Sequence, residues 1–247
     1  MSDNLSRSSD ITYLVIMSLF GLLLVGLLVV YPPRVDDYLL WRKPLIGLAF
    51  GLICVFGILA IFFPTRCSRI LDFRKEEKPG RPFHDKFALH GASPSLRGHH
   101  PNCGSFAAHV FRIGNKTFCA ACTGLLLGGL LALVGTLLYF FGNWRIGHSG
   151  SLMVWMGVMG VGFGLFQFKS RSFVRLFLNV FFVLGTLLIL IGVDKLVHSV
   201  ATDLFLVALI LFWLFTRISL SQRDHERICY ACKVVSCEFA DRKKRVD

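Results

Sequence analysis

Residues 11–30 read ITYLVIMSLFGLLLVGLLVV, and residues 44–63 read PLIGLAFGLICVFGILAIFF. Neither stretch contains a charged residue. A helix needs about 20 consecutive apolar residues to cross the hydrocarbon core of a bilayer, so each stretch is long enough to span a membrane. Such runs predict transmembrane helices, and they decide the fold class of the chain.

Four more apolar runs follow these two. They cover residues 123–141, 151–168, 173–193 and 197–215. The runs do not alternate apolar and polar residues, as the strands of a transmembrane β-barrel do. The sequence therefore predicts an all-α membrane protein of about six transmembrane helices.

The composition agrees with a membrane location. Hydrophobic residues make up 54% of the 247 residues and charged residues 17%, whereas a soluble domain averages about 25% charged residues. The net charge of +12 is typical of basic loops that set membrane topology and contact anionic lipid headgroups. We expect membrane lipid as a partner and no nucleic acid.

The distribution of lysine and arginine predicts the orientation. If the N-terminus lies in the cytoplasm, the inner segments hold 22 of the 27 basic residues. The outer connections hold the others, which are Arg34, Arg42, Lys43, Arg145 and Lys195. Because inner loops are enriched in basic residues, we expect a multi-pass protein of the cell (plasma) membrane with both termini in the cytoplasm.

The chain divides into four predicted regions. They are a transmembrane hairpin (1–64), a cytoplasmic loop (65–122), a four-helix transmembrane region (123–215) and a cytoplasmic tail (216–247). Prolines and glycines in the loop disfavour regular structure, so we expect an irregular loop with a small folded knot near its end. The tail is expected to begin as a continuation of the sixth helix.

Glycines recur within the spans, with Gly47 and Gly51 in the second and Gly157 and Gly160 in the fourth. Small residues let transmembrane helices approach closely where lipid supplies no hydrophobic drive. We interpret these glycines as packing residues.

Six of the eight cysteines fall in two short windows on the predicted cytoplasmic side. The cytosol disfavours disulfides, so clustered cysteines there point to metal ligands. In the first window, the pair His100 and Cys103 is followed after fifteen residues by the pair Cys119 and Cys122. Two such pairs complete a tetrahedral zinc site. The alternative ligands are His99 and His109.

The second window offers four ligands, namely His225, Cys229, Cys232 and Cys237. Each window binds its own ion in one layout. In the other, the Cys119/Cys122 and Cys229/Cys232 pairs share one all-cysteine site. An iron–sulfur cluster is a further alternative, but the histidines favour zinc and no ferredoxin-like run of cysteines is present.

The stretch Cys119-x-x-Cys122-Thr123-Gly124-x-x-x-Gly128 runs directly into an apolar span. It resembles uncharacterised prokaryotic multi-span membrane proteins that carry a C-x-x-C-T-G-x-x-x-G motif at a helix mouth. The resemblance covers residues 97–130 and excludes the C-terminal cysteines. It implies a prokaryotic origin and carries no assigned activity.

Charged residues near the last two spans are candidates for a second site, because charge inside a membrane is costly. Asp194, His198 and Asp203 surround the connection between these spans. If the helix continues, Asp194 and His198 share a face at i and i+4 and offer a cation or proton site. In the competing interpretation, Asp194 and Lys195 lie at the wet boundary of the membrane as turn residues.

Two polar residues at the start of the fifth span have simpler roles. Arg175 is expected to extend to the inner surface, and Asn179 is expected to bond between helices.

The chain carries no G-x-S-x-G, H-E-x-x-H, P-loop or dinucleotide-binding motif. The sequence favours structural zinc sites on the cytoplasmic face of a scaffold, assembly factor or accessory subunit, with a protein partner at that face. One alternative is an ion or metal transporter that uses Asp194, His198 and Asp203. The other is an iron–sulfur redox protein.

Overall fold

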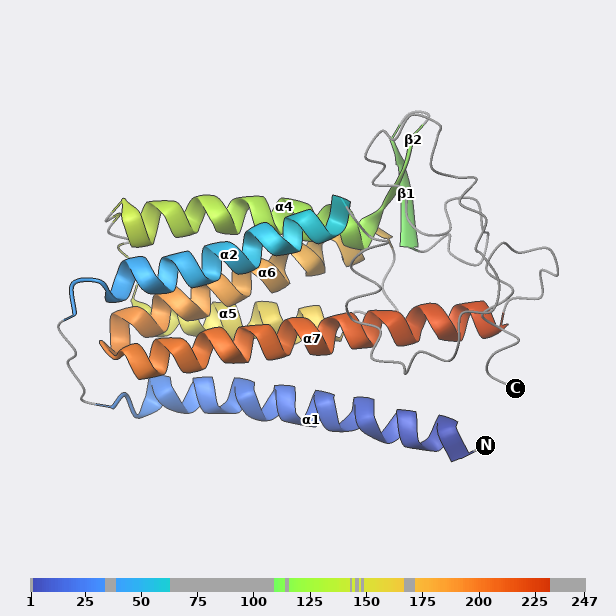
Figure 1. Cartoon of the computed structure of the whole chain (residues 1–247), viewed down its shortest axis with the longest axis horizontal. Helices are drawn as coiled ribbons and strands as arrows, with labels where there is room; N and C mark the ends of the chain where they lie inside the picture. Colours follow the sequence, from blue (N-terminus) through green and yellow to red (C-terminus); the bar gives the residue numbers. More distant parts are fainter. Residues whose placement is uncertain are drawn as a thin grey trace, which may run out of the picture.

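In the part of the chain that the structure describes, six helices run back and forth as a bundle (Figure 1). The computed structural model describes residues 2–33, 39–62, 109–113, 116–142, 144, 147, 149–166 and 172–231. The helices in this part are α1 (Ser2–Val30), α2 (Arg42–Phe62), α4 (Ala120–Thr136), α5 (Gly150–Leu165), α6 (Ser172–Leu196) and α7 (Val200–Ala231). A π-helical turn, η2 (Leu137–Phe141), follows α4 without a break.

Five of these helices are long and apolar enough to cross a membrane. The spanning segments are Asp10–Val30, Arg42–Phe62, Ala120–Phe141, Ser172–Leu196 and Val200–Asp224. The remaining described helix, α5, is also apolar but has 16 residues, which corresponds to about 24 Å of helix. The chain is an integral, mainly α-helical multi-span membrane protein, as predicted, although five of the described helices, and not about six, are long enough to span.

Several helix ends differ from the ends of the apolar runs; α1, for example, already begins at Ser2. α4 begins at Ala120, so the first turn of the helix includes Cys122. α5 ends at Leu165, three residues before the predicted end. α7 continues past its apolar segment to Ala231, which confirms that the tail begins as a continuation of the sixth helix.

α6 is the central helix of the bundle. Within its spanning segment 61% of the residues are buried, against 22% for α2. α5 packs against α6 through glycines: a Cβ added at Gly157 would lie 2.6 Å from the Gly185 oxygen, and one added at Gly192 would lie 2.7 Å from the Gly150 oxygen. The two backbones therefore touch directly along this seam, as predicted for the glycines of the fourth span.

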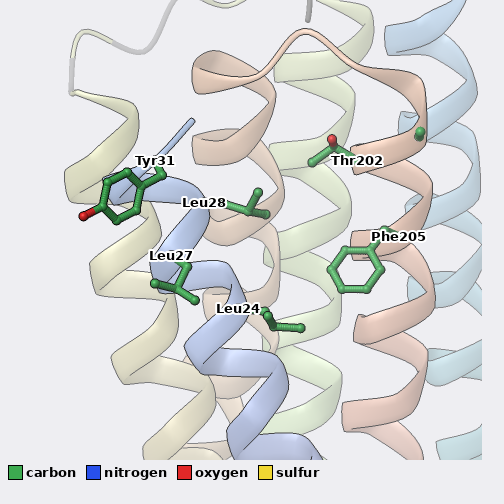
Figure 2. Close-up of a pocket in the computed structure, with 7 residues that line it drawn as sticks. Leu24, Leu27, Leu28, Tyr31, Thr202 and Phe205 are labelled. Atoms are coloured by element: carbon green, nitrogen blue, oxygen red, sulfur yellow. The ribbon is translucent and has the colours of Figure 1, made fainter. Parts of the chain in front are cut away.

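The middle of α1 lies against α7. A groove separates the C-terminal end of α1 from the start of α7. The Ser18 hydroxyl donates a 3.0 Å hydrogen bond to Thr216, and the Trp213 indole donates a 3.1 Å hydrogen bond to the Ser18 carbonyl. Figure 2 shows the groove, where Leu24 and Leu28 point from α1 toward α7; its volume is about 590 Å³. Its other lining residues are Leu27, Tyr31, Ala201, Thr202 and Phe205. The lining is mainly apolar and suits contact with lipid chains.

A short antiparallel hairpin precedes α4 (Figure 1). Its strands are β1 (Val110–Ile113) and β2 (Lys116–Cys119), with Val110 opposite Cys119. Phe111 stacks on Phe118 at 5.7 Å and contacts Phe173 of α6 at 5.8 Å, so the hairpin packs on the start of α6. We call this end of the bundle, where α1 begins and α7 ends, the hairpin end.

Candidate functional site

Cys119 and Cys122 meet where the hairpin joins α4. Cys119 ends β2 and caps the start of α4, and Cys122 lies in the first turn of that helix. Both are half-buried. The Cys122 thiol lies within hydrogen-bonding reach of Cys119, and this hydrogen bond lowers the pKa of Cys119, although burial acts in the opposite direction. Cys119 is therefore predisposed to act as a thiolate ligand.

Most other predicted metal ligands lie outside the described residues. These are His100, Cys103, Cys232 and Cys237, together with the alternative ligand His99. His225 and Cys229 belong to the last turns of α7, but their side chains are not described. Within the described part of the chain, no three metal-binding side chains come together. The described ligands of the predicted sites are thus Cys119 and Cys122.

A polar cluster lies next to this cysteine pair, between the hairpin, α6 and α7. We call it the Arg175 cluster; its members are His109, Arg175, Asn179, Arg217 and Asp224. The Arg175 guanidinium lies 2.8 Å from His109 Nδ1 and donates to Asp224 Oδ2 at 3.3 and 3.4 Å. The Arg217 guanidinium donates to Asn179 Oδ1 at 3.0 Å. The cluster thereby ties α6 to α7 and the hairpin to both.

The contacts of His109 define its protonation state. A guanidinium only donates hydrogen bonds, so Nδ1 accepts and the neutral ring carries its proton on Nε2, which lies 3.6 Å from Asp224. Burial lowers the pKa of His109, and Arg175 lowers it further. His109, an alternative zinc ligand in the sequence, therefore directs both ring nitrogens at the Arg175 cluster.

Two predictions for the fifth span can be compared with these contacts. Arg175 was expected to extend to the inner surface, but its side chain is 7% exposed and held between His109 and Asp224. The Asp224 carboxylate, instead of water at the inner surface, is the partner of its charge. Asn179 does bond between helices, as expected, through Arg217 of α7.

A second charged cluster lies at the opposite end of the bundle. We call it the Arg42 cluster; its members are Arg42, Tyr139, Asp194 and Asp203. Arg42 lies 2.6 Å from Asp194 Oδ1 and 2.7 Å from Asp203 Oδ2. The three charged side chains are 4%, 2% and 0% exposed. Arg42 therefore bridges α2 to the end of α6 and the start of α7.

Tyr139 reaches this cluster from the π-helical turn. The turn widens the helix, and Tyr139 and Phe140 are both buried although they are adjacent in sequence. The Tyr139 hydroxyl donates a 2.6 Å hydrogen bond to Asp194, while Phe140 fills the space over Gly47. The turn thus joins α4 to the charge cluster and to α2 at once.

The Arg42 cluster corrects three expectations. Asp194 is not a turn residue at the wet boundary, because it lies inside the bundle against Arg42. Arg42, assigned to an outer connection, begins α2 and is buried. α6 ends at Leu196, so the exposed His198 does not share a helical face with Asp194. The proposed trio of Asp194, His198 and Asp203 is therefore not assembled as a cation site.

Arg42 is the member of this cluster that the sequence did not predict, although one feature of the sequence points to it. Asp203 lies in an apolar run and needs a cationic partner, because an unpaired carboxylate in a membrane is costly. Arg42 flanks another apolar run and meets that need. For Arg217 no comparable signal was visible.

No family model, no curated protein and no solved structure matches the chain. The class of the protein, an integral multi-span membrane protein, rests on its helices alone.

Proposed function

We propose that the protein is a membrane scaffold, assembly factor or accessory subunit whose cytoplasmic face is organised by zinc. The proposed ligands of the first ion are His100, Cys103, Cys119 and Cys122. The observation that carries the proposal is the meeting of Cys119 and Cys122 at the junction of the hairpin and α4.

The hairpin supports this ligand set through the path of the chain. Val110 lies opposite Cys119, and Cys103 precedes Val110 by seven residues. Seven residues span at most about 25 Å, so the H-x-x-C pair is within reach of the cysteine pair. A zinc ion would then fasten a proline-rich segment to the start of a transmembrane helix, where it cannot build a core of its own.

We propose a second zinc site in the tail, with His225, Cys229, Cys232 and Cys237 as ligands. The shared all-cysteine site remains the competing layout, because Cys229 follows Asp224 by five residues on α7, or about 7.5 Å of helix. Asp224 itself contacts His109 of the hairpin end. Two ions per chain support separate sites, and one ion supports the shared site.

The transporter alternative finds less support in the geometry. Its two carboxylates are held by Arg42, which occupies the place that a transported cation would take. Iron in the purified protein, with visible absorption, would favour the iron–sulfur alternative.

The first prediction concerns the metal content of protein purified without oxygen in mild detergent. The wild-type protein should be colourless and should contain about one zinc ion for each site of four ligands, which is about two ions per chain if the two sites are separate. Replacing Cys119 and Cys122 together with Ser should remove the ion of that site, because two of its ligands are lost. Hydrogen exchange of the β1–β2 amides should rise in the same variant.

Cys54→Ala is the matched control, because it removes a buried thiol of α2 that lies outside both windows. It should keep all the zinc and the protection of the hairpin. If the protein contains iron and absorbs visible light, the site holds an iron–sulfur cluster and not zinc. Metal-free wild-type protein, or a double Ser variant that retains its zinc, would refute the proposed site.

A second prediction concerns the orientation, for which we propose both termini in the cytoplasm. Alkaline phosphatase needs disulfides and is inactive in the reducing cytosol. A fusion after Asp247 should therefore lack phosphatase activity, whereas a green fluorescent protein at the same place should fluoresce. The opposite pair of results would place the hairpin end outside the cell.

A further inference from the structure

The Arg175 cluster has more positive than negative charge. Arg175 and Arg217 each carry a positive charge, and Asp224 is the single carboxylate among the members of the cluster. His109 adds no charge, because its Nδ1 accepts a hydrogen bond from Arg175. The cluster therefore has one positive charge in excess.

The excess charge lies at Arg217. Within the described part of the chain this guanidinium contacts no carboxylate: its Nη2 donates to the neutral Asn179 amide, and its Nε has no hydrogen-bond partner. Asn179 also donates a 2.7 Å hydrogen bond to the Arg175 carbonyl, and Arg217 is close enough to Arg175 to be repelled by it. Both arginines are buried. Since an unpaired charge inside a membrane protein is costly, an anionic ligand is expected beside them.

The end of α5 shows how deep these residues lie. A Cβ added at Gly164, next to the last residue of α5, would lie 2.5 Å from the Phe182 Cβ. α5 therefore ends at the level of Phe182. Asn179 and Arg175 lie three and seven residues closer to the hairpin end, or about 4.5 and 10.5 Å along α6. Both residues are thus beyond the end of α5.

α5 is also too short to cross the whole hydrocarbon core. Its 16 residues correspond to about 24 Å of helix, against about 30 Å for the core. A bilayer adapts to a short helix by thinning around it, which brings the phosphates of neighbouring lipids toward the level of Asn179 and Arg175. Lipid phosphate and the excess positive charge therefore meet at the same depth.

We propose that Arg175 and Arg217 bind the phosphate group of an anionic phospholipid from the leaflet at the hairpin end. A phospholipid with one negative charge balances the excess of the cluster, and anionic lipid headgroups bind to basic residues between transmembrane helices. Guanidinium groups suit this role because they donate several hydrogen bonds to phosphate oxygens. The exposed side chains of Phe177 and Phe181, on the same turns of α6, offer an apolar surface for the acyl chains, which free phosphate would not need. The site does not depend on the zinc proposal.

The wild-type protein gives the first test. Full-length protein is purified in mild detergent, freed of lipid and titrated with anionic phosphatidylglycerol or with zwitterionic phosphatidylcholine, while native mass spectrometry counts the bound lipids. One phosphatidylglycerol per chain should bind in preference to phosphatidylcholine. Equal binding of the two lipids would overturn the proposal. So would binding of inorganic phosphate, in a parallel titration, without binding of phosphatidylglycerol.

Arg217→Gln tests the site itself, because it removes the charge and keeps a donor for Asn179. Its affinity for phosphatidylglycerol should fall about fivefold or more, the effect of one basic residue near an anionic surface. Arg217→Lys keeps the charge and should retain most of the affinity. Circular dichroism checks that each variant is folded, and the lipid preference of the wild type tests the proposal without any variant.

Arg223→Gln is the matched control. It removes an exposed positive charge six residues further along α7 and should leave the affinity for phosphatidylglycerol almost unchanged. If Arg217→Gln and Arg223→Gln lose affinity equally, the lipid is held by general attraction to a basic surface, and the proposed site is wrong. Unchanged affinity in Arg217→Gln would also overturn it.

Discussion

Replacing Arg42 with Gln should lower the free energy of unfolding by about 3–5 kcal/mol, the usual cost of removing one partner from a buried ion pair. Asp194 and Asp203 would remain at 2% and 0% exposure without the cation that lies 2.6 and 2.7 Å away. Tyr139 donates to Asp194 but cannot neutralise its charge. Reversible unfolding in mixed detergent micelles, followed by circular dichroism, measures the change.

Lys43→Gln is the matched control for the Arg42→Gln variant. Lys43 neighbours Arg42 in sequence and lies 3.9 Å from Asp194, but it is 42% exposed. Exposed ion pairs contribute about 0–1 kcal/mol, so this variant should unfold almost like the wild type.

A second variant separates charge from packing. The triple variant Arg42→Gln, Asp194→Asn and Asp203→Asn removes the orphaned charges with the cation and should recover most of the stability. If Arg42→Gln is no less stable than Lys43→Gln, the ion triad does not hold α2 to α6 and α7.

Replacing Gly157 with Leu should have an effect of similar size. A Cβ at this position would lie 2.6 Å from the Gly185 oxygen, 2.7 Å from Ile189 Cγ1 and 2.9 Å from the Ile189 nitrogen. Backbone atoms cannot rotate away as a side chain can, so α5 and α6 must separate. Overpacking commonly costs about 1–3 kcal/mol, and a whole leucine side chain against backbone should reach the upper limit.

Gly162→Leu is the matched control within the same helix. A Cβ at Gly162 meets nothing within 4 Å, so its side chain should extend into lipid. Thermal unfolding of both variants in the same detergent provides the comparison. Equal stabilities would mean that α5 and α6 are not in backbone contact at Gly157.

The helices were predictable because a bilayer imposes a simple rule on sequence. Each apolar run had to satisfy its backbone polar groups internally, which a helix does. The ends were less predictable, as α4 shows. Its first residue is Ala120, because the hairpin ends at Cys119 and the helix follows without a loop. The apolar run that predicted this helix begins three residues later, at residue 123.

The charge clusters were the least predictable feature. Arg42 and Asp203 are 161 positions apart, and no local pattern relates them. The cost of a lone carboxylate in a span indicates that a partner exists, but it does not say which of several basic residues supplies it. The cysteine pair is different, since positions three apart at a helix start must be neighbours. The remaining predicted ligands lie outside the described residues and stay predictions.

The two charged clusters share the same pair of helices, with one cluster near each end. α6 carries Arg175 and Asp194, while α7 carries Asp203 and Asp224. The paired positions are 19 and 21 residues apart, which gives about 28 and 32 Å of unbroken helix. Sliding either helix along its axis by one turn, about 5.4 Å, would break the polar contacts at both ends together. α6 and α7 therefore form a frame of fixed length, and any large movement within the membrane has to come from helices outside it, such as α1.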